Sequence, residues 1–291
     1  NNNSKGDIMI LLDFSSIAMS SIFPRIDDYD EDKDLIRHTM LNIIRKYNVD
    51  YREKYGETIV CFDAGNSWRR QQFAPYKANR RKNRDNSIHD WNGIFNMVNQ
   101  VREDIINLSP YRCIFVDGCE ADDAIGWIVH TQHDTDEHML IVSPDNDFKQ
   151  LQCYENVVQY SNIQKKWIKC KDAEEELWMK IIKGDTGDGV PNVLSDDEVL
   201  ITEGARQTPV TQKQIRMLQE DPNNWPTRIQ KNWIRNKELI DLQMTPPEYK
   251  SQIEEQFNQE PKGNIQLWMN YLMKHKMKLL LESLDDFEIR Y

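Results

Sequence analysis

No apolar run in the sequence approaches the about 18 residues that a membrane-spanning helix needs. The chain also lacks an apolar leader, because residues Asn1–Ser4 run directly into a strand-like segment, so we expect no signal peptide. Internal repeats and low-complexity tracts are absent, and a hydrophobic content of 39% is too high for a disordered chain. We therefore expect a globular cytoplasmic protein without a membrane contact.

Cysteine and histidine are scarce. The five cysteines are odd in number and widely spaced, and the six histidines show no metal-ligand spacing. This argues against a zinc site and against disulfides, and it favours small core residues in a reducing compartment. The cysteines are Cys61, Cys113, Cys119, Cys153 and Cys170. The net charge of −11 argues at first against a polyanionic partner, but the distribution of the charges matters more than their sum.

Three acids lie between a predicted strand at residues 111–116 and a predicted helix at residues 124–129. Glu120 and Asp123 are three residues apart and share a helix face, whereas Asp122 points elsewhere. Open α/β sheets form their sites at the carboxyl ends of strands, which is where these acids fall. On this stretch alone, the alternative that the acids only cap the helix and complement its dipole has about equal weight.

The same kind of acid recurs at four other strand ends or loops. Buried strands are predicted at residues 7–13, 58–62 and 138–142, and a glycine-rich acidic loop at residues 183–191. A single Asp at a strand end is about twice as often a turn former as a ligand, but repetition at successive strands reverses this preference. The nine acids are Asp13, Asp63, Glu120, Asp122, Asp123, Asp145, Asp147, Asp185 and Asp188.

So many carboxylates at one edge of a sheet would repel each other unless divalent cations lay among them. An all-oxygen ligand set selects Mg²⁺ or Mn²⁺ over zinc. Two such ions can activate a water and orient a phosphodiester for in-line attack, without a serine or cysteine nucleophile.

Residues 64–84 contain seven cations and no acid, with Trp68, Phe73 and Tyr76 among them. Cations that meet phosphates and rings that stack on bases suit a nucleic-acid strand. The alternative, a solvated mobile loop, has a weight of about one in three, because this segment shows no pattern of a core. The cations are Arg69, Arg70, Lys77, Arg80, Arg81, Lys82 and Arg84.

The remaining pattern predicts an α/β fold followed by helices. Helices are expected over residues 36–47, 90–108 and 172–182, and two short strands over 157–160 and 166–170. Beyond Pro191, proline-punctuated helical segments at 211–220, 225–242 and 265–287 predict a helical second domain without a catalytic constellation.

Five motifs resemble those of the 5′-nuclease, or flap endonuclease, family, and most closely its phage branch that removes RNA primers. They are Asp13-Phe14-Ser15, Tyr76-Lys77-Ala78-Asn79-Arg80, Glu120-Ala121-Asp122-Asp123, Ser143-Pro144-Asp145-Asn146-Asp147 and Gly184-Asp185-Thr186-Gly187-Asp188, with Asp63 after the second strand. The resemblance implies a PIN-like α/β nuclease domain at residues 1–190, with a mostly parallel central sheet flanked by helices. It also implies a helical arch at residues 64–91 and a smaller all-helical domain at 191–291 that contacts DNA and partners.

The resemblance further implies two Mg²⁺ ions, for which Mn²⁺ substitutes. Asp13, Asp63, Glu120 and Asp122 would serve the first ion, and Asp145, Asp147, Asp185 and Asp188 the second, with Asp123 supporting. In the arch, Lys77 and Arg81 would reach the scissile phosphate and Tyr76 would stack near it. The implied catalytic set is Asp13, Asp63, Lys77, Arg81, Glu120, Asp122, Asp145 and Asp147, and the implied nucleic-acid contacts are Arg69, Arg70, Tyr76, Lys77, Arg80, Arg81, Lys82 and Arg84.

The implied activity is that of a monomeric 5′-to-3′ exonuclease and 5′-flap endonuclease acting on RNA–DNA and DNA duplexes. It would remove RNA primers in the host cytoplasm if a phage encodes it, with a single-strand-binding protein and a sliding clamp as partners. Segment 281–287 resembles a clamp-binding peptide only vaguely, and a terminal amphipathic helix is favoured at least about fourfold. Residues 195–203 lack the glycine hairpin with which most relatives hold a duplex through potassium.

Two other functions fit parts of the sequence. A catalytically inactive protein that binds branched DNA would show gaps in the acid set, and the set is complete. A phosphatase of small phosphoesters would need an Asp-x-Asp nucleophile at Asp13, where Phe14-Ser15 follow instead.

Overall fold

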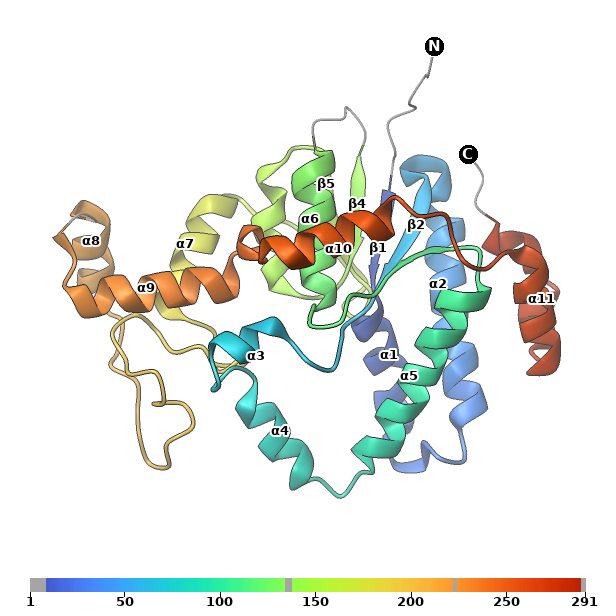
Figure 1. The fold of residues 1–291 in the computed structure, drawn as a ribbon, viewed down its shortest axis with the longest axis horizontal. Coiled ribbons are helices and arrows are strands. Elements are labelled where there is room, and N and C mark those ends of the chain that lie inside the picture. The colour runs from blue at the N-terminus through green and yellow to red at the C-terminus, as the bar shows by residue number, and fades with distance from the viewer. Residues whose placement is uncertain (1–8, 134–137, 222–223, 289–291) are drawn as a thin grey trace, which may run out of the picture.

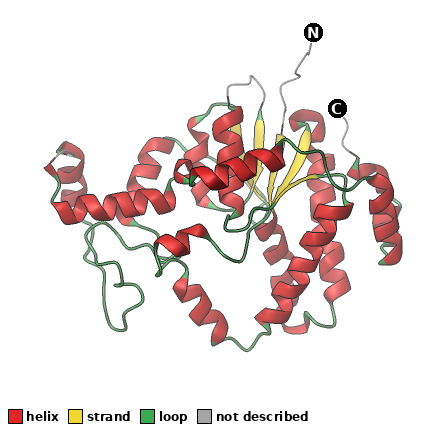
Figure 2. Ribbon diagram, in the orientation of Figure 1, coloured by secondary structure: helices red, strands yellow, loops and turns green. Residues whose placement is uncertain are grey.

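The computed structural model describes residues 9–133, 138–221 and 224–288. A six-stranded sheet in the order β3-β2-β1-β4-β5-β6 lies at its centre, with helices on both faces (Figure 2). Strands β1 to β5 run parallel, and β6 pairs antiparallel with β5. The strands are β1 (Met9–Asp13), β2 (Glu57–Cys61), β3 (Arg112–Ile114), β4 (Met139–Val142), β5 (Val157–Ser161) and β6 (Lys166–Ile168). This confirms the predicted mostly parallel α/β sheet.

The register aligns the carboxyl ends of the central strands. Asp13 of β1 lies opposite Cys61 of β2, and Leu12 lies opposite Val142 of β4. The chain adds β2 and β3 on one side of β1 and then β4 and β5 on the other. The carboxyl ends of β1 and β4 therefore flank the switch point at which open α/β sheets bind ligands.

Each face of the sheet is covered by its own hydrophobic cluster, because successive side chains of a strand point to opposite faces. On β1, Ile10 and Leu12 join a cluster with helices α1 (Phe14–Ile22), α2 (Lys33–Tyr55), α5 (Trp91–Leu108) and α11 (Ile265–Lys274). Met9 and Leu11 join the opposite cluster with α6 (Ala121–Gln132) and α10 (Pro247–Phe257). Burial on both faces explains why the strands read as continuous apolar runs.

The C-terminal helices share their cores with the sheet. Each of the four hydrophobic clusters of the described residues combines residues before and after position 190. Trp268 and Phe287 pack on one face of the sheet and Ile253 on the other. The predicted helical character of this region is confirmed, whereas the domain boundary at residue 190 stays a sequence-based proposal. The remaining helices here are α8 (Gln212–Glu220), α9 (Thr227–Ile240), η4 (Leu242–Met244), α12 (Lys278–Leu281) and η5 (Leu284–Phe287).

Three local expectations were wrong or incomplete. Helix α1 was not predicted; it begins directly after β1, and the Asp13 carboxylate accepts a hydrogen bond from the Ser16 N–H. The single helix expected over 265–287 is divided into α11, α12 and η5, with Lys276 at a φ of 55° between the first two. Helix α10 lies outside the predicted segments; it begins at Pro247, and proline is favoured in the first turn of a helix.

Other expectations can be compared directly. All five cysteines are free, as predicted. Within the described ranges, none of the helices is long and apolar enough to cross a bilayer. Phe287 is fully buried, so the segment 281–287 does not present a free clamp-binding peptide. The expectation for residues Asn1–Ser4 lies outside the described residues.

The predicted arch region forms two limbs. Helix α3 (Trp68–Gln72) leads into α4 (Ala78–Asp85), and α4 and α5 converge on the turn that connects them (Figure 1). At the other end of the site, η2 (Asn146–Cys153) follows β4, and α7 (Ala173–Lys183) leads into the acidic loop.

Candidate active site

At the carboxyl edge of the sheet, five acids influence one another's protonation, and we call them the first carboxylate group: Asp13, Asp63, Glu120, Asp122 and Asp145. Among the described residues, only Asp147, Asp185 and Asp188 bring three carboxylate oxygens within 4.8 Å of one another. Short hydrogen bonds from neighbouring elements fix two acids of the first group. The Asp63 carboxylate accepts from the Ala121 N–H at 2.6 Å and from the Ser15 hydroxyl. The Asp13 carboxylate accepts from the Ser143 hydroxyl at 2.7 Å. These bonds tie β1, β2, β4 and α6 together at one point.

Burial and mutual repulsion raise the pKa of several carboxyl groups in this set. Burial and the charge of Asp63 raise the pKa of Asp13 to about 7. Burial, followed by the charges of Asp145, Asp13 and Asp63, raises the pKa of Asp122 well above its usual value. Burial and Glu120 raise the pKa of Asp63 in the same way. Carboxylates that repel each other this strongly suit a site where a divalent cation supplies the missing positive charge.

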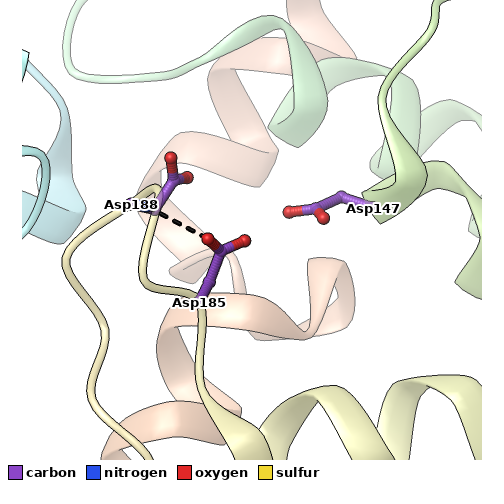
Figure 3. Close-up of side chains that lie close together, drawn as sticks. All are labelled: Asp147, Asp185 and Asp188. Atoms are coloured by element: carbon purple, nitrogen blue, oxygen red, sulfur yellow. Dashed lines mark hydrogen bonds between the residues drawn. The ribbon is translucent and has the colours of Figure 1, made fainter.

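The second carboxylate group consists of Asp147, Asp185 and Asp188, whose ligand oxygens all lie within 4.8 Å of one another. Figure 3 shows Asp147 pointing toward the other two from the opposite side of the opening. The loop that carries Asp185 and Asp188 is closed by two backbone hydrogen bonds of 2.8 Å between Asp185 and Val190. The Asp188 N–H donates to Asp185 Oδ1 at 3.1 Å (Figure 3).

Asp145 belongs to the first group and is also influenced by the charge of Asp185 in the second. It caps η2, where its carboxylate accepts from the Asp147 N–H at 2.9 Å. Among the charged neighbours that raise the pKa of Asp122, Asp145 has the largest effect, and Asp185 in turn raises the pKa of Asp145. The resemblance implied Asp145 for the second ion; since charges of both groups act with it, its assignment to one ion stays a proposal.

Besides Arg69, which reaches Glu120 at 3.2 Å, three cations pair with these carboxylates. Lys77 forms ion pairs with Glu120 and, at 3.7 Å, with Asp188, which also binds Arg80. Lys180 of α7 forms ion pairs with Asp147 and, at 2.9 Å, with Asp185. The sequence reasoning missed Lys180 because it considered only the acids there, although a lysine in the last turn of a helix before an acidic loop was a usable signal.

The base of the arch packs against the loop of the second carboxylate group. Lys77 adopts a left-handed conformation with a φ of 54°, and its N–H donates to the Asp188 carbonyl at 2.7 Å. Gly189 has a φ of 74°, and a Cβ there would lie 2.6 Å from the Pro75 carbonyl oxygen. A side chain at position 189 would therefore push the arch base and the acidic loop apart.

The aromatic residues of segment 64–84 do not present rings for base stacking, which corrects the sequence-based reading. Trp68, Phe73 and Tyr76 are all buried, and Phe73 and Tyr76 belong to a hydrophobic cluster with α7 and α9. The Tyr76 hydroxyl donates to Glu120 Oε2 at 2.8 Å. The segment therefore has a core pattern after all, one whose partners lie more than a hundred residues away.

Arg69 and Asp123 also differ from their predicted roles. Arg69 is 2% exposed and Asp123 is 0% exposed, and two guanidinium nitrogens each donate to the Asp123 carboxylate at 2.9 Å. Neither side chain faces a phosphate or a metal ion from solvent. We therefore withdraw Arg69 as a nucleic-acid contact and Asp123 as a metal ligand.

The other predicted nucleic-acid contacts lie on α3 and α4. Arg80, Arg81 and Lys82 are exposed on α4. Arg70 is partly exposed, and the guanidinium of Arg84 lies over the Phe95 ring of the other limb at 5.4 Å.

Protonation of the first carboxylate group predicts a pH-dependent effect of Mg²⁺ on stability. Folded Asp13 holds its proton up to about pH 7, whereas the unfolded chain releases it near 3.8. Without metal, stability should therefore fall as the pH rises from about 4 to about 7, because folding then requires proton uptake. Thermal melts in EDTA and in Mg²⁺ should show a larger stabilisation by Mg²⁺ at about pH 8 than at about pH 5, since binding displaces protons. An equal Mg²⁺ effect at both pH values would contradict this coupling.

The sequence matches two family models. The model of the 5′-3′ exonuclease N-terminal resolvase-like domain matches residues 9–178, and that of the T4 RNase H C-terminal domain matches residues 171–287. A curated relative, the Ribonuclease H of Enterobacteria phage T4, is 33% identical over 293 residues, which is 95% of this chain and 95% of that protein.

Solved structures of bacteriophage T5 proteins share the fold. A flap endonuclease variant in a complex with DNA and metal ions has a TM-score of 0.61 at 19% identity, covering 95% of this chain and 99% of that one. The 5′-exonuclease with bound zinc ions has a TM-score of 0.54 at 20% identity, covering 96% and 99%. Because one family model spans more than half of the sequence and the T4 relative aligns along nearly all of it, the chain belongs to the 5′-3′ exonuclease family, with a C-terminal region of the T4 RNase H type.

Proposed function

We propose that the protein is a metal-dependent 5′-to-3′ exonuclease and 5′-flap endonuclease that hydrolyses RNA–DNA and DNA duplexes and removes RNA primers during phage DNA replication. The observation that carries this proposal is the cluster of Asp147, Asp185 and Asp188, next to the mutually repelling first carboxylate group and the cation Lys77 at the base of the arch. The relative named Ribonuclease H and the flap endonuclease crystallised with DNA support it.

The cofactor we propose is two Mg²⁺ ions, with Mn²⁺ as a substitute. The residues fit such ions: their donors are all oxygens, Asp147, Asp185 and Asp188 converge within 4.8 Å, and the repulsion within the first group calls for positive charge. Asp13, Asp63, Glu120 and Asp122 would hold one ion and Asp147, Asp185 and Asp188 the other, with Asp145, which both groups influence, as a further ligand. When bound, the ions supply an activated water and charge stabilisation of the phosphodiester.

The side chains of the arch bind and orient the substrate. Lys77 and Arg80 lie at its base beside Glu120 and Asp188, where a phosphate that approaches the ions comes within their reach. Arg81, which the resemblance implied at the scissile phosphate, is exposed on α4 like Lys82, so we propose Arg80 for that place and assign Arg81 and Lys82 to the phosphates of a 5′ single strand. The Tyr76 hydroxyl fixes one oxygen of Glu120 and leaves the other to Lys77.

An end-labelled 5′ flap and an RNA-primed duplex provide the test. Incubation with Mg²⁺ should release the label, and incubation with EDTA should not. Tight binding without metal-dependent release would instead favour the inactive DNA-binding protein. A single-strand-binding protein and a sliding clamp as partners, a monomeric state and a location in the host cytoplasm stay sequence-based proposals.

Lys180 is expected to compete with the second ion. Its ammonium group lies between Asp147 and Asp185, so Lys180→Ala should strengthen Mg²⁺ binding about tenfold, a modest part of the interaction between charges at this separation. The same variant should lower the melting temperature without metal, because the acids lose their counter-charge. Isothermal titration calorimetry measures the affinity, and Lys183→Ala, an exposed lysine of the same helix, is the control. Weaker Mg²⁺ binding in the Lys180 variant would contradict the competition.

A further inference from the structure

The buried ion pair between Arg69 and Asp123 connects three segments that are far apart in the sequence. Arg69 lies on α3 at the base of the arch and Asp123 in the first turn of α6. Arg69 also donates from Nε to the Leu239 carbonyl at 2.8 Å, and the Thr245 hydroxyl donates to Asp123 Oδ1 at 2.7 Å. The segment 239–245, which begins in the last turn of α9, is thus bonded to both members of the pair.

The pair also holds Glu120, an acid of the first carboxylate group. Asp123 Oδ2 accepts from the Glu120 N–H at 2.9 Å, and Arg69 Nη1 donates to Glu120 Oε2 at 3.2 Å. The main chain and the side chain of Glu120 are therefore both fixed by this pair. The Trp68 Nε1–H completes the ring of donors around Asp123 at 3.2 Å.

Stability alone does not explain a fully buried pair of charges. The free energy needed to remove both charges from water is often as large as the free energy gained from their attraction. Replacing such a pair with apolar residues is therefore frequently neutral or stabilising. The planar guanidinium instead offers fixed geometry, because its nitrogens can bond several partners in set directions at once. Here the partners of Arg69 are two carboxylates and one carbonyl.

We infer that Arg69 and Asp123 are positioning residues that hold the Glu120 carboxylate among the metal-binding oxygens. Because residues 239–245 bond to both of them, the position of Glu120 also depends on the packing of that segment. The inference rests on the proposed function, since it assigns Glu120 to the metal site. Neither residue touches substrate or metal, and the C-terminal region contributes to the site through Thr245 and the Leu239 carbonyl.

The decisive variant is the double substitution Arg69→Gln with Asp123→Asn. It removes one positive and one negative charge, so the net charge of the site is unchanged, and any change in metal affinity reports geometry. The matched control is Arg112→Gln with Glu57→Gln. Arg112 pairs with Glu57 at 3.0 Å and also bonds C-terminal carbonyls, but it lies at the opposite edge of the sheet.

Mg²⁺ affinity of the protein without nucleic acid, measured by calorimetry, gives a readout independent of cleavage. The Arg69/Asp123 double variant should bind Mg²⁺ about 10- to 100-fold more weakly, the usual effect of losing partners that orient metal ligands. Its kcat at saturating Mg²⁺ should fall, while its KM for the flap stays within about threefold because the cations on α4 are intact. The control pair should match the wild type in Mg²⁺ affinity. A folded Arg69/Asp123 double variant with wild-type Mg²⁺ affinity would overturn the inference.

Thr245→Val tests the bond between the C-terminal region and Asp123. It also tests the positioning role if the double variant does not fold. It removes only the hydroxyl that donates to Asp123, at a residue 2% exposed. Mg²⁺ binding should weaken several-fold; unchanged binding would overturn the dependence on segment 239–245.

Because the wild type is assayed in parallel, absence of Mg²⁺ binding or cleavage in the wild type would count against the proposed function, whereas wild-type behaviour of the variants would count against the positioning role alone.

Discussion

Asp145→Asn should abolish cleavage and leave nucleic-acid binding nearly intact. Asp145 belongs to the first carboxylate group and interacts electrostatically with Asp185 of the second, so the isosteric amide removes a carboxylate that we propose as a metal ligand. We expect kcat to fall at least about a thousandfold, the order seen when a group that stabilises transition-state charge is lost. Binding rests on the cations of α4, and the dissociation constant should change less than about threefold. Single-turnover cleavage and fluorescence anisotropy measure the two quantities.

Asp117→Asn is the matched control for this variant. Asp117 is an exposed acid just beyond β3, outside both carboxylate groups, and its substitution should leave cleavage unchanged. If Asp145→Asn weakened binding as much as it weakened cleavage, the separation of binding by the arch from catalysis by the carboxylates would be wrong.

Lys77→Ala should reduce turnover far more than it reduces affinity. The Lys77 ammonium lies between Glu120 and Asp188, within the carboxylate groups, whereas Arg81 and Lys82 point to solvent along α4. A cation placed beside the reacting phosphate acts mainly in the transition state, so kcat should fall about a hundredfold. Initial rates over a range of flap concentrations separate kcat from KM.

Lys82→Ala gives the opposite pattern and serves as the comparison. A phosphate contact away from the reacting centre contributes equally to the ground state and the transition state, so KM should rise while kcat stays close to that of the wild type. A pure affinity defect in Lys77→Ala, of the kind expected for Lys82→Ala, would refute the transition-state role of Lys77.

The strand-end acids were predictable from the sequence because two simple rules act together. A buried parallel strand is an uninterrupted apolar run, and the carboxyl ends of parallel strands share one edge. Asp13 and Asp63 therefore followed from the runs before them. How the acids divide was less accessible, since Asp145 caps η2 and is influenced by acids of both groups, which its position in the sequence does not indicate.

The roles of Arg69 and Tyr76 could not be read from composition. A segment rich in cations and aromatics favours nucleic-acid binding, but it does not say which side chains turn inward. The acceptor of Arg69 lies 54 residues further along the chain, and its third partner, the Leu239 carbonyl, lies 170 residues away. Such pairings depend on how α3, α6 and the C-terminal end of α9 pack together, and the local periodicity of the sequence does not indicate them.

The C-terminal helices show the same limit. Their apolar spacing indicated helices correctly, but amphipathic helices fit a separate bundle as well as the faces of a sheet. Only the tertiary structure shows that Trp268 and Ile253 complete the two cores of the nuclease region.

Anomalous diffraction from crystals grown with Mn²⁺ tests the central claim most directly. We expect one peak among Asp13, Asp63, Glu120 and Asp122 and a second among Asp147, Asp185 and Asp188. If crystals grown at Mn²⁺ concentrations that support cleavage in solution showed a peak in neither carboxylate group, this result would contradict the account.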